Sequence, residues 1–304
     1  MQQVTVRVPA STSNLGPGYD CLGVALRLHN SVTLVRSNTR RISHARIVSD
    51  AAERFFKQTG LGRFSFSYSI VERIPRCRGL GSSATVRLGI LFGLNHLGGE
   101  PLDRFTVFRL CAELEGHPDN AAPATFGGFT VVQSSASVSR ARDNPEECPA
   151  VYRFEVAPRL YFVLLVPDLE IETARARRIL PSKIPRVAAV ENCANACALT
   201  AAFASRDYEK MRGSFSDNLH QPFRAKLIKF LPRVIAAAER AGALGAFLSG
   251  SGSAIAAITL NAPEKIATAM ARAAAVPAHT TITHADNRGA HVLPIRGRTS
   301  GIHQ

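Results

Sequence analysis

The chain has 304 residues, of which 46% are hydrophobic and 20% are charged. A chain of this length and composition can bury sizeable cores, which excludes disordered, collagen-like and low-complexity proteins. Its 37 Lys and Arg residues outnumber its 23 Asp and Glu residues, for a net charge of +14. This charge favours polyanionic partners or small anionic substrates, and it does not choose between them.

The sequence shows no sign of a membrane anchor, a secretory signal or a disulfide framework. No stretch approaches the roughly 18 uncharged apolar residues that a membrane span requires, and the longest candidate is 193–204. Residues 4–8 alternate apolar and polar side chains, as in a strand, where a signal peptide would have an apolar core. The six cysteines form no C-x-x-C pair and no zinc-like spacing with histidines. We therefore expect a soluble, cytoplasmic protein with reduced thiols.

The amino-terminal half predicts strands around a glycine-rich loop. Strands are expected at 4–8 and 31–35, with a loop at 9–20 between them. Residues 64–70 alternate aromatic or aliphatic side chains with serines, which predicts a half-buried antiparallel strand. After the glycine-rich segment 78–84, leucines recur at helical spacing until Gly98 and Gly99, so a buried helix should follow the loop.

The carboxy-terminal half mixes strands and helices. Strands are expected at 129–132, 152–156 and 160–166, with a turn region at 143–149. Helices are expected at 188–204, 223–231, 233–241 and 263–274, and a strand, Gly-Ser turn and strand at 246–259. The composition shifts near Pro158, where we place a boundary between domains 1–158 and 159–304. No repeat of fixed period is present, and the mixture predicts an α+β fold of two layered domains.

A glycine-rich loop, Pro75-Arg-Cys-Arg-Gly-Leu-Gly-Ser-Ser-Ala84, has the parts of a phosphate-binding site. Its glycines let backbone N–H groups approach an anion, and it supplies hydroxyl groups and the positive end of a helix dipole. It contains neither the Gly-Lys-Ser/Thr of a P-loop nor the G-x-G-x-x-G of a dinucleotide-binding fold. The alternative is a glycine turn that serves only the close packing of a helix and a strand.

The same segment resembles the P-x-x-x-G-L-G-S-S-A signature of the GHMP kinases, a family that phosphorylates small alcohols with ATP. Segments 9–23 and 245–252 resemble the first and third motifs of that family in order and spacing. Within the family, segments 115–120 and 173–181 are similar to the homoserine kinase branch. The resemblance implies a two-domain GHMP kinase fold, with an amino-terminal layer like domain 2 of ribosomal protein S5 and a carboxy-terminal ferredoxin-like layer.

The resemblance also implies how the substrate is held. L-Homoserine is a zwitterion with a terminal hydroxyl, so a selective site needs guanidinium groups for its carboxylate and an acid for its ammonium. The match implies that Arg177 and Arg224 bind the carboxylate and that Asp20 binds the ammonium. Asn14 and His117 would add hydrogen bonds.

ATP binding is implied for two glycine loops. The residues implied are Pro75, Arg78, Gly79, Leu80, Gly81, Ser82, Ser83, Ala84, Thr173, Gly250 and Gly252. The second loop, 242–253, departs from the family pattern because Ser253 and Ala254 stand where Pro-Thr is usual. The missing proline leaves the rigidity of this loop open.

Phosphoryl transfer depends on positioning and charge neutralisation, so a Mg²⁺ ion near the phosphates is expected. Glu115 with Ser82 is the expected ligand set, and Glu113 competes with Glu115. Whichever glutamate is not the ligand should lie on a solvated helix face. The implied catalytic residues are Asp119, Asn120 and Arg177. For Asp119 two roles stay open, a general base for the hydroxyl or an orienter of its neighbours.

Two alternative functions remain at this point. A GHMP kinase acting on mevalonate, shikimate or pantoate would not need Asp20 and two arginines together. A basic RNA-binding protein of related fold would use the positive charge, but such proteins gather charge and aromatic side chains on one face, whereas this chain has no tryptophan and scatters its arginines. We expect L-homoserine and ATP as partners, with no nucleic acid and no membrane, and the resemblance leaves room for a homodimer.

Overall fold

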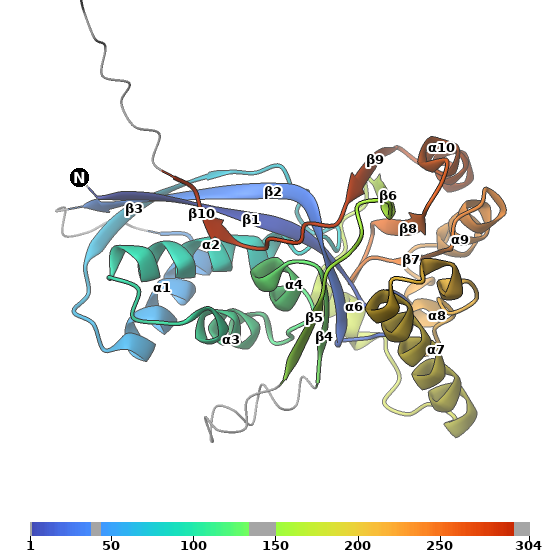
Figure 1. Ribbon diagram of the computed structural model, residues 1–304, viewed down its shortest axis with the longest axis horizontal. Coiled ribbons are helices and arrows are strands. Elements are labelled where there is room, and N and C mark those ends of the chain that lie inside the picture. Colours follow the sequence, from blue (N-terminus) through green and yellow to red (C-terminus); the bar gives the residue numbers. More distant parts are fainter. Residues whose placement is uncertain (1, 38–43, 134–149, 295–304) are drawn as a thin grey trace, which may run out of the picture.

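The computed structural model describes residues 2–37, 44–133 and 150–294 of the chain. These residues form two antiparallel sheets with helices packed against them (Figure 1). The expected α+β fold of two domains is confirmed. The expected turn region at 143–149 lies outside the described residues.

The first sheet has six strands in the order β10-β1-β2-β4-β5, with β3 also paired to β2. Their bounds are β1 (Gln3–Ser13), β2 (Leu22–Ser37), β3 (Ser65–Val71), β4 (Phe129–Val132), β5 (Val151–Phe154) and β10 (His291–Val292). β1 and β2 are longer than expected, because they pair from Gln3 with Val35 to Ser13 with Gly23. The loop between them is therefore confined to 14–21 and begins deep in the molecule.

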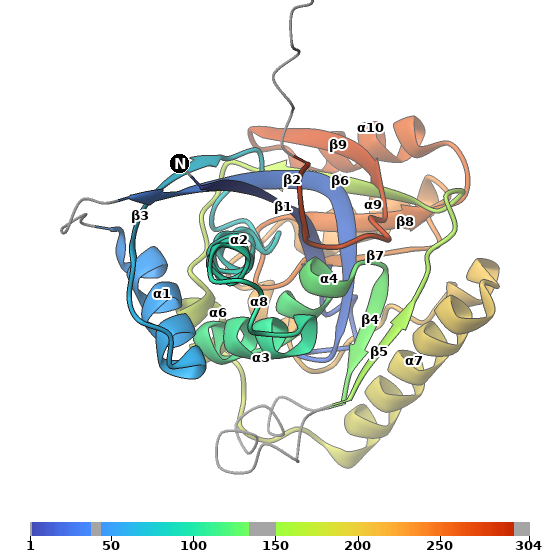
Figure 2. The ribbon, with the colours of Figure 1, turned by 60° about the vertical axis from the view of Figure 1, so that its left-hand side comes forward.

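Four helices cover one face of this sheet. They are α1 (Arg46–Thr59), α2 (Ser82–Leu97), α3 (Arg104–Glu115) and α4 (Ala121–Phe126). α2 lies against β1 and β2, with α1 and α3 beside it (Figure 2). α1 was not anticipated from the sequence, although its buried residues, Val48, Ala51, Ala52, Phe55 and Phe56, have the spacing of an amphipathic helix.

The second sheet has the strand order β7-β8-β6-β9. Its strands are β6 (Tyr161–Pro167), β7 (Gly245–Leu248), β8 (Ile255–Thr259) and β9 (Ala278–His284), and its longer helices are α7 (Arg186–Ser205), α9 (Leu231–Arg240) and α10 (Pro263–Ala274). β6 is buried on both faces: Val163 belongs to the core with α9 and α10, and Phe162 to the core with the last turns of α7. The short helices α6 (Thr173–Arg178), η1 (Tyr208–Met211) and α8 (Gln221–Arg224) complete this half.

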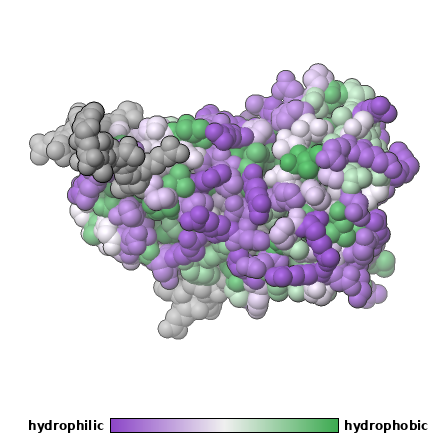
Figure 3. All heavy atoms as spheres, turned by 45° about the horizontal axis from the view of Figure 1, so that its top comes forward, coloured by the Kyte–Doolittle hydropathy of each residue, from purple (hydrophilic) through white to green (hydrophobic). Residues whose placement is uncertain are grey.

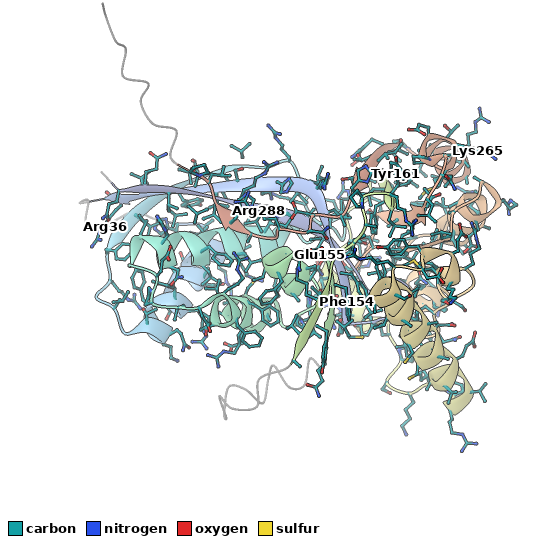
Figure 4. The ribbon with its side chains drawn as sticks, viewed as in Figure 1. Arg36, Phe154, Glu155, Tyr161, Lys265 and Arg288 are labelled. Atoms are coloured by element: carbon teal, nitrogen blue, oxygen red, sulfur yellow. The ribbon has the colours of Figure 1, made fainter. Side chains whose placement is uncertain are left out.

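The chain passes between the sheets twice. It first leaves β5 at Phe154 and Glu155 and reaches Tyr161 on β6, as Figure 4 shows. It later returns from β9 to β10, which pairs with β1 through Val6 and Val292. The domain boundary near Pro158 stays a prediction. It falls between β5 and β6, but β10, which follows it in the sequence, belongs to the first sheet. On the face drawn in Figure 3, hydrophilic side chains predominate over both halves.

The expectation of one helix over 223–231 is wrong. α8 ends at Arg224 and α9 begins at Leu231. Between them the backbone forms turns with i to i−3 hydrogen bonds, such as Lys226 N to Phe223 O and Leu227 N to Arg224 O. A proline stands near the start of each helix. At that position the N–H that proline lacks has no partner within the helix, so each proline favours the start of a separate short helix.

α7 is a further difference from the sequence analysis, which expected no segment long enough to cross a membrane. Although α7 contains charged and amide side chains, its length and mean hydropathy would allow it to cross a membrane, and 22% of its most apolar window is buried. The helix also carries amides that bind backbone carbonyls: Asn192 donates to Pro17 at 2.6 Å and Asn195 donates to Ser216 at 3.1 Å. α7 therefore anchors the loop between β1 and β2.

Candidate active site

A cavity of about 130 Å³ collects the predicted site residues from six separate segments. It is lined by Asn14, Tyr19 and Asp20, by Pro75, Cys77, Arg78, Gly79, Leu80, Gly81, Ser82 and Ser83, by Glu115, His117, Asp119 and Asn120, by Ile171, Thr173 and Arg177, by Arg224, and by Gly250 and Ser251. Of the predicted residues, only Ala84 and Gly252 are absent from this lining; Ala84 is buried in α2.

The first glycine loop needs glycine for both conformation and space. Gly79 has φ +74°, and an added Cβ would lie 2.1 Å from the carbonyl oxygen of Ser249. Gly81 has φ +69°, and a Cβ there would lie 2.2 Å from Ser11 Oγ. Gly81 is also the N-cap of α2, with no side-chain cap on the helix N–H groups. The loop therefore presents free N–H groups at a helix N-terminus on the cavity wall, which is an anion-binding arrangement.

The second glycine loop packs directly on the first. Ser249 Oγ donates to Gly79 O at 2.7 Å, and Ala254 N donates to Arg78 O at 3.0 Å. Ser253 Oγ donates to the carbonyl oxygen of Leu169. Ser253 and Ala254, which replace the usual Pro-Thr, are thus both tied to neighbouring backbone.

The two candidate magnesium ligands on α3 lie on different sides of the helix. Glu115 accepts a hydrogen bond of 2.7 Å from Ser83 Oγ and another from Arg87, and it faces the cavity. Glu113 instead pairs with Arg54 of α1 at 2.7 Å, and its side chain is 3% exposed. The expectation that one glutamate lies on a solvated face is wrong, because α1 covers that face. Of the two glutamates, Glu115 is the one that lines the cavity beside the phosphate loop, and the hydroxyl that contacts its carboxylate is that of Ser83 rather than Ser82.

His117, Asp119 and Asn120 form a hydrogen-bonded group at the start of α4. His117 Nδ1 and Asp119 Oδ1 are 2.5 Å apart, and the same oxygen accepts from Asn120 N at 2.9 Å. Burial alone would raise the pKa of Asp119, but the charge and the hydrogen bond of His117 outweigh it and lower that pKa to about 2. Asp119 is thus a fully ionised carboxylate that holds His117 and the backbone of Asn120.

Arg177 and Asp20 form a two-pronged ion pair across the cavity. Arg177 donates to the two carboxylate oxygens of Asp20 at 2.9 and 2.7 Å, and to Tyr19 Oη at 2.9 Å. Burial would lower the pKa of Arg177, but the hydrogen bonds and charge of Asp20 raise it. Asn14 Oδ1 accepts from the backbone N–H of Asp20 at 3.0 Å, which holds the backbone from which this carboxylate projects.

Arg224 is 2% exposed and has no carboxylate partner among the residues that the structure describes. It donates to the carbonyl oxygens of Ala176 and Gly250 at 3.2 and 2.9 Å, and to His220 Nδ1 at 3.2 Å. His220 Nε2 in turn donates to Gly16 O at 2.9 Å. Burial lowers the pKa of His220 to about 4, so a neutral imidazole orients Arg224 toward the cavity.

Comparison with known proteins adds to this geometry. Residues 46–128 match the amino-terminal domain of the GHMP kinases and residues 199–276 match their carboxy-terminal domain. A homoserine kinase from Moorella thermoacetica is 37% identical over 88% of this chain and 91% of its own length. One from Microchaete diplosiphon is 34% identical over 96% and 98%. The chain belongs to the GHMP kinases. A crystal structure of homoserine kinase from Cytophaga hutchinsonii superposes with a TM-score of 0.85 at 26% identity, over 96% of this chain and 98% of that one.

Membership of the GHMP kinases makes the chain an enzyme and decides against the RNA-binding alternative. The sequence analysis missed four residues that line the cavity, Tyr19, Cys77, Ile171 and Ser251. It also missed Arg87 and His220, which contact the lining residues Glu115 and Arg224. Tyr19 stands beside Asp20 in the first motif, and His220 lies one helical turn before Arg224, so both could have been found from their neighbours. The contact of Arg87 with Glu115 joins two helices and left no signal in the sequence.

Proposed function

We propose that this GHMP kinase transfers the γ-phosphoryl group of ATP to the side-chain hydroxyl of L-homoserine, forming O-phospho-L-homoserine for threonine biosynthesis. The observation that carries the proposal is the set of charged side chains that lines the cavity together with the phosphate loop. Arg224 and Arg177 supply two guanidinium groups and Asp20 supplies one carboxylate, all from different segments. This set matches an α-amino acid, and relatives named homoserine kinase cover nearly the whole chain.

The phosphates of ATP fit the loop at Gly79 to Ser83, because its N–H groups and the α2 N-terminus favour negative charge there. A second cavity of about 700 Å³ adjoins this loop and shares Cys77, Ser82 and Ser83 with the first. Its walls come from α1, β3 and α2, and include Val48, Tyr68 and Ile70. The apolar walls suit a nucleoside, so the triphosphate would run from this cavity into the smaller one.

The residues around Glu115 fit a magnesium ion. Oxygen ligands and few protein contacts suit Mg²⁺, which takes its other ligands from phosphates and water. Glu115 would hold it, with a hydroxyl of Ser82 or Ser83 beside it, and Arg87 fixes the orientation of the carboxylate. Bound there, the ion would neutralise charge on the phosphates.

In the reaction, the hydroxyl oxygen bonds to the γ-phosphorus, the bond from that phosphorus to the bridging oxygen breaks, and the hydroxyl proton is released. Asp119 has a pKa of about 2, so it is a poor proton acceptor at neutral pH. We therefore assign Asp119 the orienting role, with Asn120 and His117 placed by it near the hydroxyl. A loose transition state needs little prior deprotonation, and the phosphate oxygens can take the proton. Arg177 would contribute by fixing the substrate.

The test is ADP release by the purified protein with Mg²⁺ and ATP, measured for L-homoserine, mevalonate, shikimate and pantoate. We expect turnover with L-homoserine and a kcat/KM at least about 100-fold higher than for the other alcohols. Preference for another alcohol would contradict the proposal. A cytoplasmic location remains a prediction from the cysteine pattern, and a homodimer remains a prediction of the family resemblance.

A further inference from the structure

The ion pair between Asp20 and Arg177 uses a group that the proposed substrate also needs. Both outer nitrogens of Arg177 donate to the carboxylate of Asp20, so the guanidinium fork already holds one carboxylate. Arg224, the second guanidinium of the cavity, bonds only to neutral acceptors among the described residues. The charge of Arg177 is therefore balanced by a carboxylate of the protein, whereas no described residue forms an ion pair with Arg224.

Resting on the proposed function, we propose that the Asp20–Arg177 pair selects alcohols that carry a carboxylate and an ammonium together. The ammonium of the substrate draws Asp20 away from Arg177, and the freed guanidinium then joins Arg224 on the substrate carboxylate. Asp20 acts as an internal stand-in for the substrate carboxylate and is a specificity-determining residue.

The charges explain the selection. A substrate with a carboxylate alone can pair with Arg224, but at Arg177 it meets the carboxylate of Asp20, and two like charges then share one guanidinium. The pair is partly buried, with side-chain exposures of 34% for Arg177 and 16% for Asp20, so separating it without a replacement partner is costly. A zwitterionic substrate supplies an ammonium for Asp20 and a carboxylate for Arg177, and its binding leaves the net charge of the site unchanged.

Tyr19 keeps the two guanidinium groups in place while their partners change. The carbon atoms at the centres of the Arg177 and Arg224 guanidinium groups lie 5.5 and 5.4 Å from the centroid of the Tyr19 ring. Tyr19 Oη also accepts from Arg177 at 2.9 Å, beside the bonds to Asp20. Arg177 thus retains a contact when Asp20 leaves.

The experiment compares wild-type enzyme and Asp20→Asn with L-homoserine and with 4-hydroxybutyrate, which is L-homoserine without its amino group. We expect the substitution to lower kcat/KM for L-homoserine by about 100-fold and to raise kcat/KM for 4-hydroxybutyrate several-fold, because Arg177 is no longer occupied by a carboxylate. Asp207→Asn, which removes a carboxylate from an exposed pair with Lys210, should change neither value. An equal fall for both alcohols in Asp20→Asn would overturn the proposal.

A measurement on the wild-type enzyme covers the case in which Asp20→Asn does not fold. Methylammonium chloride supplies the missing cation, so it should raise kcat/KM for 4-hydroxybutyrate several-fold over sodium chloride at the same ionic strength. Identical rates in the two salts would overturn the proposal. Failure of the wild-type enzyme to phosphorylate L-homoserine at all would instead contradict the proposed function.

Discussion

Gly79 and Ser249 join the two glycine loops of this kinase through a hydrogen bond of 2.7 Å from the Ser249 hydroxyl to the Gly79 carbonyl. The two residues are 170 positions apart. The same contact leaves no room for a Cβ on Gly79, since it would lie 2.1 Å from Ser249 O. The phosphate loop therefore keeps its shape because the carboxy-terminal half of the chain packs against it.

Gly79→Ala should raise the KM for ATP by at least about 10-fold and lower the free energy of unfolding by more than about 2 kcal/mol, because the new methyl group pushes the loops apart. Gly99→Ala is the matched control, since Gly99 has φ +85° with open space around it. The control should cost only about 1 kcal/mol and leave the KM unchanged. Steady-state kinetics and thermal unfolding measure both, and equal effects of the two substitutions would argue against the close contact.

Glu115→Gln and Glu113→Gln should have different consequences, although the residues are two positions apart. Glu115→Gln should raise the Mg²⁺ concentration needed for half-maximal rate by at least about 10-fold, because a neutral amide binds the ion poorly. Glu113→Gln should leave that concentration unchanged and lower the free energy of unfolding by about 1 to 3 kcal/mol, because Arg54 loses its charged partner. A shifted magnesium requirement in Glu113→Gln would show that the assignment is reversed.

Asp119→Asn tests the orienting role. If Asp119 only orients His117 and Asn120, kcat should fall by about 10-fold, because an amide keeps part of the hydrogen bonding. A general base would cost about 10² to 10⁴-fold. Single-turnover rates at saturating ATP and L-homoserine distinguish the two ranges, and a loss of about 10²-fold or more would restore Asp119 as the base.

His220 should make stability depend on pH. Burial, with a contribution from Arg224, lowers its folded-state pKa to about 4 from an ordinary 6.5, against the opposing charge of Asp217. Between these values the unfolded chain binds more protons, so the free energy of unfolding falls as pH drops from 6.5 to 4, by roughly 3 kcal/mol. Chemical unfolding of wild-type enzyme and His220→Asn across this range should show a shallower slope in the variant. Exposed His96→Gln should keep the wild-type slope; a wild-type slope in His220→Asn would contradict the assignment.

The parts of the site that could be predicted from the sequence are those that local backbone geometry dictates. The segment Gly79 to Ser83 requires positive φ at fixed positions, and that requirement is visible in the residues themselves. The pairings were not visible, because they join distant segments: Arg177 meets Asp20 across 157 positions and Arg54 meets Glu113 across 59. Because helix α1 was not predicted, its residue Arg54 was not recognised as a partner of Glu113. Glu113 was therefore expected on a solvated face. The break after Arg224 was missed because apolar spacing continues through the turns at 225–230.

Because β10 pairs in the first sheet, the chain cannot be cut near Pro158 into two complete domains. β10 covers the edge of β1 from a position after β9, so a fragment that stops near Pro158 would carry an open strand edge and would lack the part of the smaller cavity that lies between Ile171 and Ser251. Open edges invite pairing with other chains. Chimeras between related kinases should therefore exchange residues 159–286 as an internal block and keep both termini from one parent.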